Sequence, residues 1–112
     1  MKKVALVGFR GGDMCFWHLL INALDYKAKG YEVAIILEGE ACGLIPRLEN
    51  NELFPGKYRE ARPLITAVCK ACAAKLGGLE AAERGKLPID SSLEGHVTLS
   101  NYTDVGYEII TF

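Results

Sequence analysis

The sequence has no stretch long enough to cross a membrane and no large excess of charge of either sign. None of its apolar runs approaches the roughly 20 residues that span a bilayer. Its 112 residues include 13 basic and 14 acidic side chains, which gives a net charge of −1. No basic surplus is therefore available to neutralise a nucleic-acid backbone. We expect neither a membrane nor a nucleic acid as a partner.

Several sequence signatures of chemistry are also missing. The turn GFRGGD, residues 8–13, resembles a phosphate-binding turn but matches neither GxGxxG nor the P-loop. No serine stands in a nucleophile-elbow context, and no repeat, linker or low-complexity segment divides the chain. A composition with 50% hydrophobic and 24% charged residues is typical of a globular domain, which we place at residues 1–112.

The first residues, MKKVALVG, begin like a secretory signal peptide. The apolar run then breaks at Arg10-Gly11-Gly12-Asp13, with no small-residue cleavage site. We therefore interpret the run as the first strand of the fold and expect a cytoplasmic protein. In that compartment the four cysteines are expected to be thiols, metal ligands or redox groups rather than structural disulfides.

Apolar residues alternate between short buried runs and helical spacing. Strands are expected at residues 3–9, 31–37, 64–68, 87–89 and 107–112. Helices are expected at residues 14–29, 71–76 and 79–84, with shorter helical pieces at 41–48, 58–61 and 97–103. One helix over 58–76 competes with the third strand, but Pro63 opposes it. Asp13 is expected to cap the first helix. This alternation predicts a three-layer α/β/α sandwich around a mainly parallel sheet.

All four cysteines follow expected strands: Cys15 follows the first, Cys42 the second, and Cys69 and Cys72 the third. Parallel sheets bind ligands beyond the carboxyl ends of their strands, so the topology predicts that the cysteines share one edge of the sheet. Around them, the residues expected to line a site are Arg10, Gly11, Gly12, Asp13, Cys15, Glu38, Cys42, Lys70 and His96.

The pair Cys69-Lys70-Ala71-Cys72 is a CxxC motif at an expected strand-to-helix turn. The helix dipole and Lys70 would favour the thiolate of Cys69, which is the form that attacks sulfur or binds soft metals. The alternative is that both cysteines are small buried hydrophobes. A four-thiolate metal site is a further alternative, weakened because the chain has one CxxC rather than two. We expect no cofactor and no bound metal.

Two histidines could move protons near neutral pH. His18 lies on the first expected helix, and His96 lies just before the helical piece at 97–103. For each residue the alternative is a packing or capping role.

The chain resembles the DsrE/DsrF-like proteins, especially the small YchN-type members. The matching stretches, in order along nearly the whole chain, are KVALVGFRGGD, FWHLLINALDYKAKGYEV, IILEGEA, VCKACAAKLG, EGHVTLSNY and GYEIITF. The resemblance implies an α/β/α domain with a mainly parallel five-stranded sheet, often assembled into trimers or hexamers. Several members carry sulfur as a persulfide on a cysteine that follows a strand and opens a helix.

That position corresponds here to Cys69, with Cys72 as a resolving thiol. The resemblance therefore implies a sulfur-relay or sulfurtransferase-like protein, with sulfur donor and acceptor proteins as partners. The alternative is a non-catalytic oligomeric module that binds a small ligand or a metal. A homo-oligomer is expected, because Phe16, Trp17 and Leu20 would offer apolar helix surface for a second subunit to cover.

Overall fold

The computed structural model covers all 112 residues and contains five strands in one parallel sheet. The strands are β1 (Lys3–Gly8), β2 (Glu32–Leu37), β3 (Ile65–Cys69), β4 (Ile89–Asp90) and β5 (Tyr107–Thr111). The α-helices are α1 (Asp13–Ala28), α2 (Ile45–Glu49), α3 (Pro55–Ala61), α4 (Lys70–Leu76), α5 (Leu79–Arg84) and α6 (Ser100–Thr103). Two 3₁₀ helices are η1 (Gly39–Leu44) and η2 (Arg62–Leu64). The expected α/β/α fold is confirmed.

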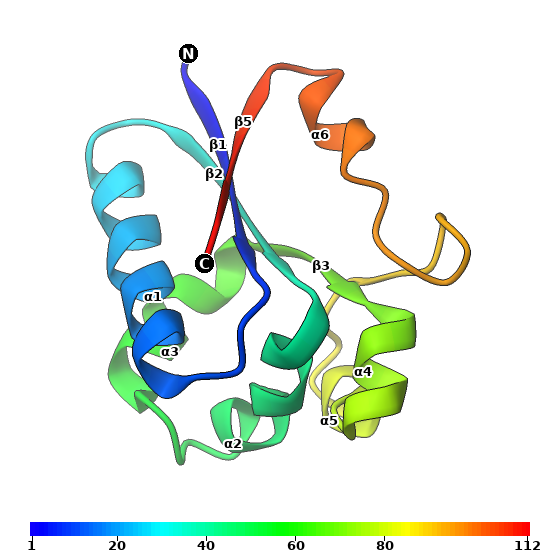
Figure 1. Ribbon diagram of the computed structural model, residues 1–112. Coiled ribbons are helices and arrows are strands. Elements are labelled where there is room, and N and C mark those ends of the chain that lie inside the picture. The colour runs from blue at the N-terminus through cyan, green and yellow to red at the C-terminus, as the bar shows by residue number, and fades with distance from the viewer.

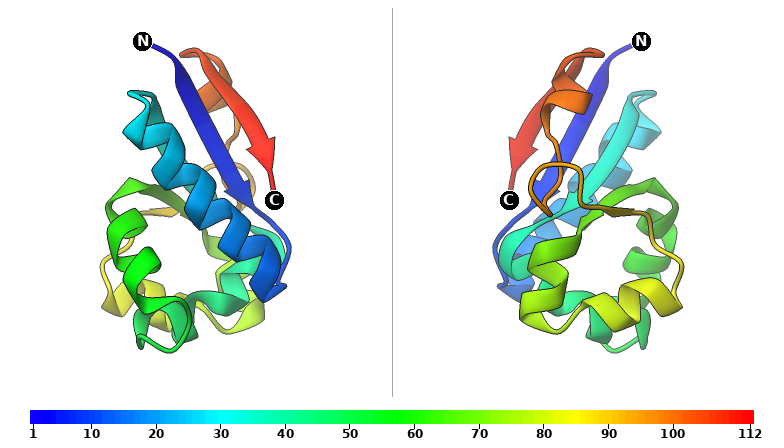
Figure 2. Two further views of the ribbon diagram at one scale, coloured as in Figure 1. Left: turned by 90° about the vertical axis from the view of Figure 1, so that its left-hand side faces the viewer. Right: turned by 90° about the vertical axis from the view of Figure 1, so that its right-hand side faces the viewer.

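The strand order is β4-β3-β2-β1-β5. Each of the first three connections moves the chain one strand in the same direction, and the last connection carries it back across the sheet to β5. Figures 1 and 2 show α1 and α3 on one side of the sheet, and α6 with the segment leading into it on the other side. In Figure 1, η1, α2, α4 and α5 gather beyond the carboxyl ends of the strands.

The helix α1 follows its apolar spacing closely. Its residues Phe16, Leu19, Leu20 and Ala23 are buried against the sheet. Burial of such a stripe supplies most of the stability of a helix in a folded domain. The helix ends where Gly30 adopts a left-handed conformation at φ +88°, as expected for a helix-terminating glycine.

Two expectations about α1 are wrong. Gly12, not Asp13, occupies the N-cap, and the Asp13 carboxylate instead pairs with Arg47 of α2 at 2.7 Å. The apolar residues that a second subunit was expected to cover are instead covered by other residues of the same chain. Phe16 and Leu20 are buried in its own core, and the Trp17 ring packs on Phe54 with 5.1 Å between ring centroids.

The strand at β3 is confirmed and the competing continuous helix is wrong. The chain passes from η2 into an extended β3 whose residues pair with β2, for example Leu37 with Val68. No helix of the structure has both the length and the apolar character needed to cross a bilayer.

Candidate functional site

The end of β3 leads directly into α4, and this junction positions the CxxC motif. Cys69 is the last residue of β3 and the N-cap of α4, and Cys72 lies in the first turn of that helix. One helical turn separates the two positions, so their side chains lie on the same face. Their Sγ atoms are 3.2 Å apart.

His96 completes a three-residue cluster from a distant part of the chain. Its Nδ1 lies 3.1 Å from the Sγ of Cys69 and 3.6 Å from the Sγ of Cys72. The three ligand-type atoms all lie within 4.8 Å of one another. We call Cys69, Cys72 and His96 the thiol cluster.

A short hairpin holds His96 in this position. The backbone N–H groups of Leu93 and His96 each donate to the other residue's carbonyl, at 2.9 and 2.8 Å. Glu94 and Gly95 between them both have positive φ, as a two-residue hairpin turn of the primed type requires. The Ala71 N–H donates to the Gly95 carbonyl at 2.9 Å, so the hairpin is attached to the first turn of α4.

Asp90 anchors the base of this hairpin and was not predicted. It pairs in register with Cys69 in the sheet. Its carboxylate accepts from the Ser92 N–H at 2.8 Å and from the Thr98 N–H at 3.4 Å. Hydrogen bonding, chiefly from Ser92, holds the pKa of Asp90 below its usual range. The signal in the sequence was Asp-Ser-Ser after a strand, a pattern that favours such a turn.

The two cysteines of the motif differ in exposure. Cys69 is completely buried, whereas Cys72 is half-buried. Burial raises the pKa of the Cys69 thiol, against an opposing effect of the backbone N–H groups of Cys72 and Val97. The expectation that the helix terminus makes Cys69 a ready thiolate is therefore wrong, because desolvation is the larger effect. Lys70 is exposed and is not among the groups that shift this pKa.

A cavity of about 670 Å³ opens beside the thiol cluster. Cys72 and His96 line it, together with Arg10, Lys75 and Glu40. Lys75 rather than Lys70 is thus the lysine of α4 that faces the cavity. Phe9 also lines this cavity. Its ring lies so close to Gly39 that a Cβ at residue 39 would come within 2.9 Å of it. Neither Phe9 nor Lys75 was predicted to line a site, because an exposed side chain leaves no periodic pattern in the sequence.

Cys42 lies against the cluster but has no access to the cavity. It is fully buried, and its Sγ–H donates to the Leu37 carbonyl at 3.4 Å, with the Cys69 carbonyl 3.9 Å away. Burial raises the pKa of Cys42 to about 12. Its thiol therefore stays neutral and fits the alternative of a small buried hydrophobe.

The remaining predicted site residues are spread along the edge. Glu38 faces His96 across a second cavity of about 510 Å³, and burial raises the pKa of Glu38 while the nearby His96 opposes the rise. Gly11 contacts Glu40 through its N–H at 3.4 Å. Gly12 and Asp13 are exposed at the start of α1 and do not line the cavity beside Cys72.

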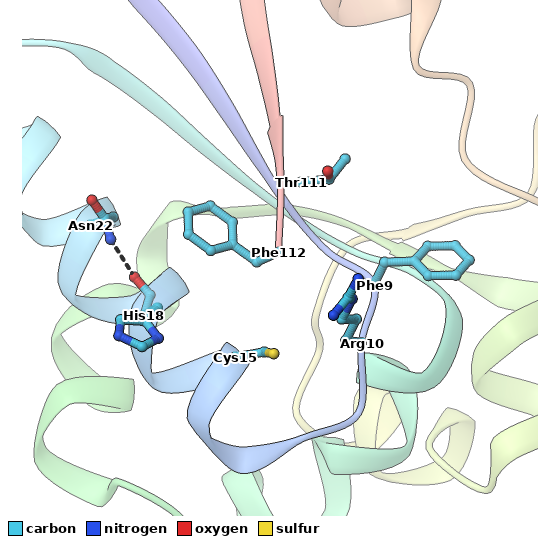
Figure 3. Close-up of a pocket in the computed structure, with 7 residues that line it drawn as sticks. All are labelled: Phe9, Arg10, Cys15, His18, Asn22, Thr111 and Phe112. Atoms are coloured by element: carbon cyan, nitrogen blue, oxygen red, sulfur yellow. Dashed lines mark hydrogen bonds between the residues drawn. The ribbon is translucent and has the colours of Figure 1, made fainter.

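Cys15 is separated from the other three cysteines. It lies with His18 and Arg10 in a cavity of about 650 Å³ at the ends of β1 and β5 (Figure 3). One strand, β2, lies between β1 and β3 in the sheet, and neighbouring strands are about 4.8 Å apart. The cysteines were predicted to share one edge of the sheet. The structure brings Cys42 to Cys69 but leaves Cys15 on a different part of that edge.

Comparisons with known proteins identify relatives without a described activity. No protein-family model matches the chain. The uncharacterized protein MJ0733 from Methanocaldococcus jannaschii is 39% identical over 94 residues, which is 83% of this chain and 76% of the relative. The chain belongs to the family of MJ0733. Identity at this level over most of both chains indicates common ancestry and a shared fold.

A solved structure of another protein has a similar fold. The conserved protein of unknown function BT1422 from Bacteroides thetaiotaomicron superposes with a TM-score of 0.73, covering 99% of this chain and 95% of its own. Its sequence identity is 18%, so the similarity concerns the fold alone.

Proposed function

We propose that this protein is a persulfide carrier that acts through the thiol cluster. The observation that carries the proposal is the contact among the two sulfur atoms, 3.2 Å apart, and a histidine nitrogen within 3.6 Å of both. A thiol pair of this kind can take, hold and release a sulfur atom by exchange at sulfur. The resemblance to DsrE/DsrF-like sulfur carriers supports the same function.

Exposure assigns different roles to the two cysteines. Cys72 lines the cavity, and Cys69 is completely buried behind it. Cys72 therefore meets the donor in this proposal, although the family resemblance assigned that role to Cys69. Cys69 is the resolving thiol.

The loading step needs only one proton acceptor. His96 Nδ1 accepts the proton of the Cys72 thiol, and the thiolate attacks the outer sulfur of a donor persulfide. The donor S–S bond breaks, and the departing donor thiolate takes the proton from His96. The product is a persulfide on Cys72.

Unloading can follow either of two balanced routes. An acceptor thiolate that attacks the outer sulfur takes it and leaves the Cys72 thiolate. In the other route, Cys69 passes its proton to His96 Nδ1, 3.1 Å away, and its thiolate attacks the inner sulfur. The outer sulfur leaves as sulfide and takes up that proton, and a Cys69–Cys72 disulfide forms. In the second route the sulfane sulfur is reduced and the two cysteines are oxidised.

The proposal also covers the cellular location of the protein, its partners and its assembly. It includes a reducing, cytoplasmic location, protein donors and acceptors of sulfur, and assembly into a homo-oligomer. The competing function is a non-catalytic module that binds a small ligand in the cavities beside Phe9 and Arg10. A thiol cluster that takes no sulfur would favour that module.

Mass spectrometry of the reduced, metal-free protein after incubation with glutathione persulfide tests the carrier function. We expect one added sulfur atom on the peptide that contains Cys69 and Cys72. Cys72→Ser should lose this loading, whereas Cys69→Ser should accumulate the persulfide because no inner thiol can expel sulfide. Cys15→Ser is the matched control and should load like the wild type. Loading that survives in Cys72→Ser but is lost in Cys15→Ser would contradict the proposal.

A further inference from the structure

The three atoms of the thiol cluster have the spacing of a partly assembled metal site. Zinc bonds of about 2.3 Å to sulfur and 2.0–2.1 Å to nitrogen, at tetrahedral angles, place two sulfur ligands about 3.8 Å apart and a sulfur and nitrogen about 3.6 Å apart. The observed distances are 3.2 Å between the sulfurs and 3.1 and 3.6 Å from them to His96 Nδ1. Shifts of about half an ångström would reach the metal geometry.

The orientation of His96 suits metal binding as well as sulfur exchange. Its Nδ1 contacts the sulfur atoms of both cysteines. A metal ion bound by both thiolates requires its third ligand to face both in this way. The hairpin hydrogen bonds of His96 and the Ala71–Gly95 contact fix the backbone that presents the ring.

The geometry points to a zinc site formed by Cys69 Sγ, Cys72 Sγ and His96 Nδ1, with a fourth position open to the cavity. Two thiolates and an imidazole are ligands that zinc accepts in proteins, and three protein ligands with one free position are typical of reactive rather than purely structural zinc. Burial decreases from Cys69 through Cys72 to His96, so the ion can arrive from the solvent side.

The surroundings of the open position favour a small anion or a water molecule as the fourth ligand. Arg10 and Lys75 line the cavity next to Cys72 and His96. A zinc ion with two thiolates and a neutral imidazole has no net charge, and the two cations would attract an anion to it. Glu40 also lines this cavity but lies outside the group of three ligand atoms.

The zinc site goes beyond the proposed sulfur carriage, although both use the same sulfur atoms. Zinc and a persulfide on Cys72 therefore exclude each other. Sulfur loading is measured on zinc-free protein and zinc binding is measured without a sulfur donor. Either activity can consequently fail while the other is present.

Cobalt(II) titration of the reduced, metal-free protein tests the site, because cobalt reports its ligands by absorption. We expect one cobalt per chain, with tetrahedral ligand-field bands and a thiolate charge-transfer band of two-thiolate intensity. Added zinc should displace the cobalt. Cys72→Ser should lower the charge-transfer intensity, and His96→Ala should weaken zinc binding by more than about 100-fold, since outer-shell changes alone cost about 10–100-fold.

Two controls keep the result independent of folding defects. Cys15→Ser should bind cobalt like the wild type, because Cys15 lies in a different cavity. In the unmodified protein, zinc should protect Cys72 but not Cys15 from alkylation. Absence of stoichiometric binding, unchanged spectra in Cys72→Ser, or equal protection of Cys15 and Cys72 would overturn the zinc site.

Discussion

At the scale of single residues, Cys69 and Cys72 differ mainly in how much of each thiol solvent can reach. Cys72 lines a cavity, and Cys69 is fully buried behind it. A brief exposure of the folded protein to iodoacetamide should therefore modify Cys72 and leave Cys69 protected. Peptide mass mapping measures both sites in one sample. Modification of Cys69 as fast as Cys72 would contradict this order.

His96 should control the reactivity of Cys72, because its Nδ1 is the nearby proton acceptor. We expect His96→Gln to slow alkylation of Cys72 at neutral pH by at least about tenfold, a modest share of what a positioned base can supply. Cys15 offers an internal control, since it lies in another cavity and its rate should stay unchanged. Equal slowing of both cysteines would indicate a general change of structure.

Cys42 should make the protein less stable in alkali. Its pKa is raised from 9.0 to about 12 in the folded state by burial. The unfolded chain loses this proton first, so the stabilising contribution is complete below pH 9 and is lost between pH 9 and 12.

A comparison with Cys42→Ala isolates this effect from other titrating groups. Between pH 8 and 10 the wild type should lose about 1.4 kcal/mol more unfolding free energy than the variant. Urea unfolding at the two pH values measures the difference. A constant difference between the two proteins would show that Cys42 ionises as easily in the folded state as in the unfolded chain.

At the scale of elements, the turn between α4 and α5 can approach η1 only because residue 78 has no side chain. A Cβ at Gly78 would lie 2.0 Å from the Cys42 carbonyl oxygen. Gly78→Ala should therefore destabilise the protein by about 1–3 kcal/mol in urea unfolding. The backbone at Gly78, with φ −102°, suits alanine, so the effect is steric.

Gly56→Ala is the matched control for this substitution. Gly56 lies in α3 and a Cβ there has no neighbour within 4 Å, so this variant should lose no stability. Equal effects at the two positions would mean that the close approach of Gly78 to η1 is absent in solution.

An ion pair joins α2 to η2. Arg62 donates to both carboxylate oxygens of Glu49 at 2.9 Å and to the Gly85 carbonyl at 2.6 Å. Glu49 also accepts from the Tyr58 hydroxyl. Because Glu49 is largely buried and Arg62 is partly exposed, Arg62→Ala should cost about 2 kcal/mol, less than the loss of a fully buried pair. Arg84→Ala breaks the exposed pair with Glu80 and should cost less than about 0.5 kcal/mol.

The pH dependence separates the two arginine variants. The pKa of Glu49 is lowered, chiefly by its hydrogen bond with Arg62. The stabilisation is therefore complete above the ordinary pKa of 4.5 and is lost as pH falls through the lower folded value. The difference between wild type and Arg62→Ala in urea unfolding should shrink in acid, whereas a pH-independent difference would rule out an electrostatic cause.

Local sequence patterns predicted most of the elements, and chain chemistry explains the deviations. The fourth strand was expected at residues 87–89 but begins at Ile89, since Pro88 has no N–H with which to pair. The helix expected at 97–103 begins only at Ser100. Val97 is buried next to Cys69 and Thr98 donates to Asp90, so these two residues remain with the hairpin.

At the scale of the whole molecule, the thiol cluster depends on the lateral order of strands, which local patterns do not specify. The sequence predicted that cysteines follow strands at one edge, and Cys69 and Cys72 were expected to form a pair. It could not show that β2 lies beside β3 while β1 lies one strand further away. That order brings Cys42 to Cys69 and leaves Cys15 apart.

His96 shows the same limit at longer range. Residue 96 reaches the CxxC motif because β4 pairs with β3 and the following hairpin folds back onto α4. The residue was expected near the site, but its contact with both sulfurs depends on a tertiary arrangement.

The location of the first sulfur atom taken up by the wild-type protein tests the central claim most directly. The reduced, metal-free protein would be treated briefly with glutathione persulfide, trapped with an alkylating reagent and mapped by peptide mass. The account predicts that the sulfur lies on Cys72, 3.2 Å from the resolving thiol of Cys69. Sulfur found first on Cys15, or on none of the cysteines, would contradict it.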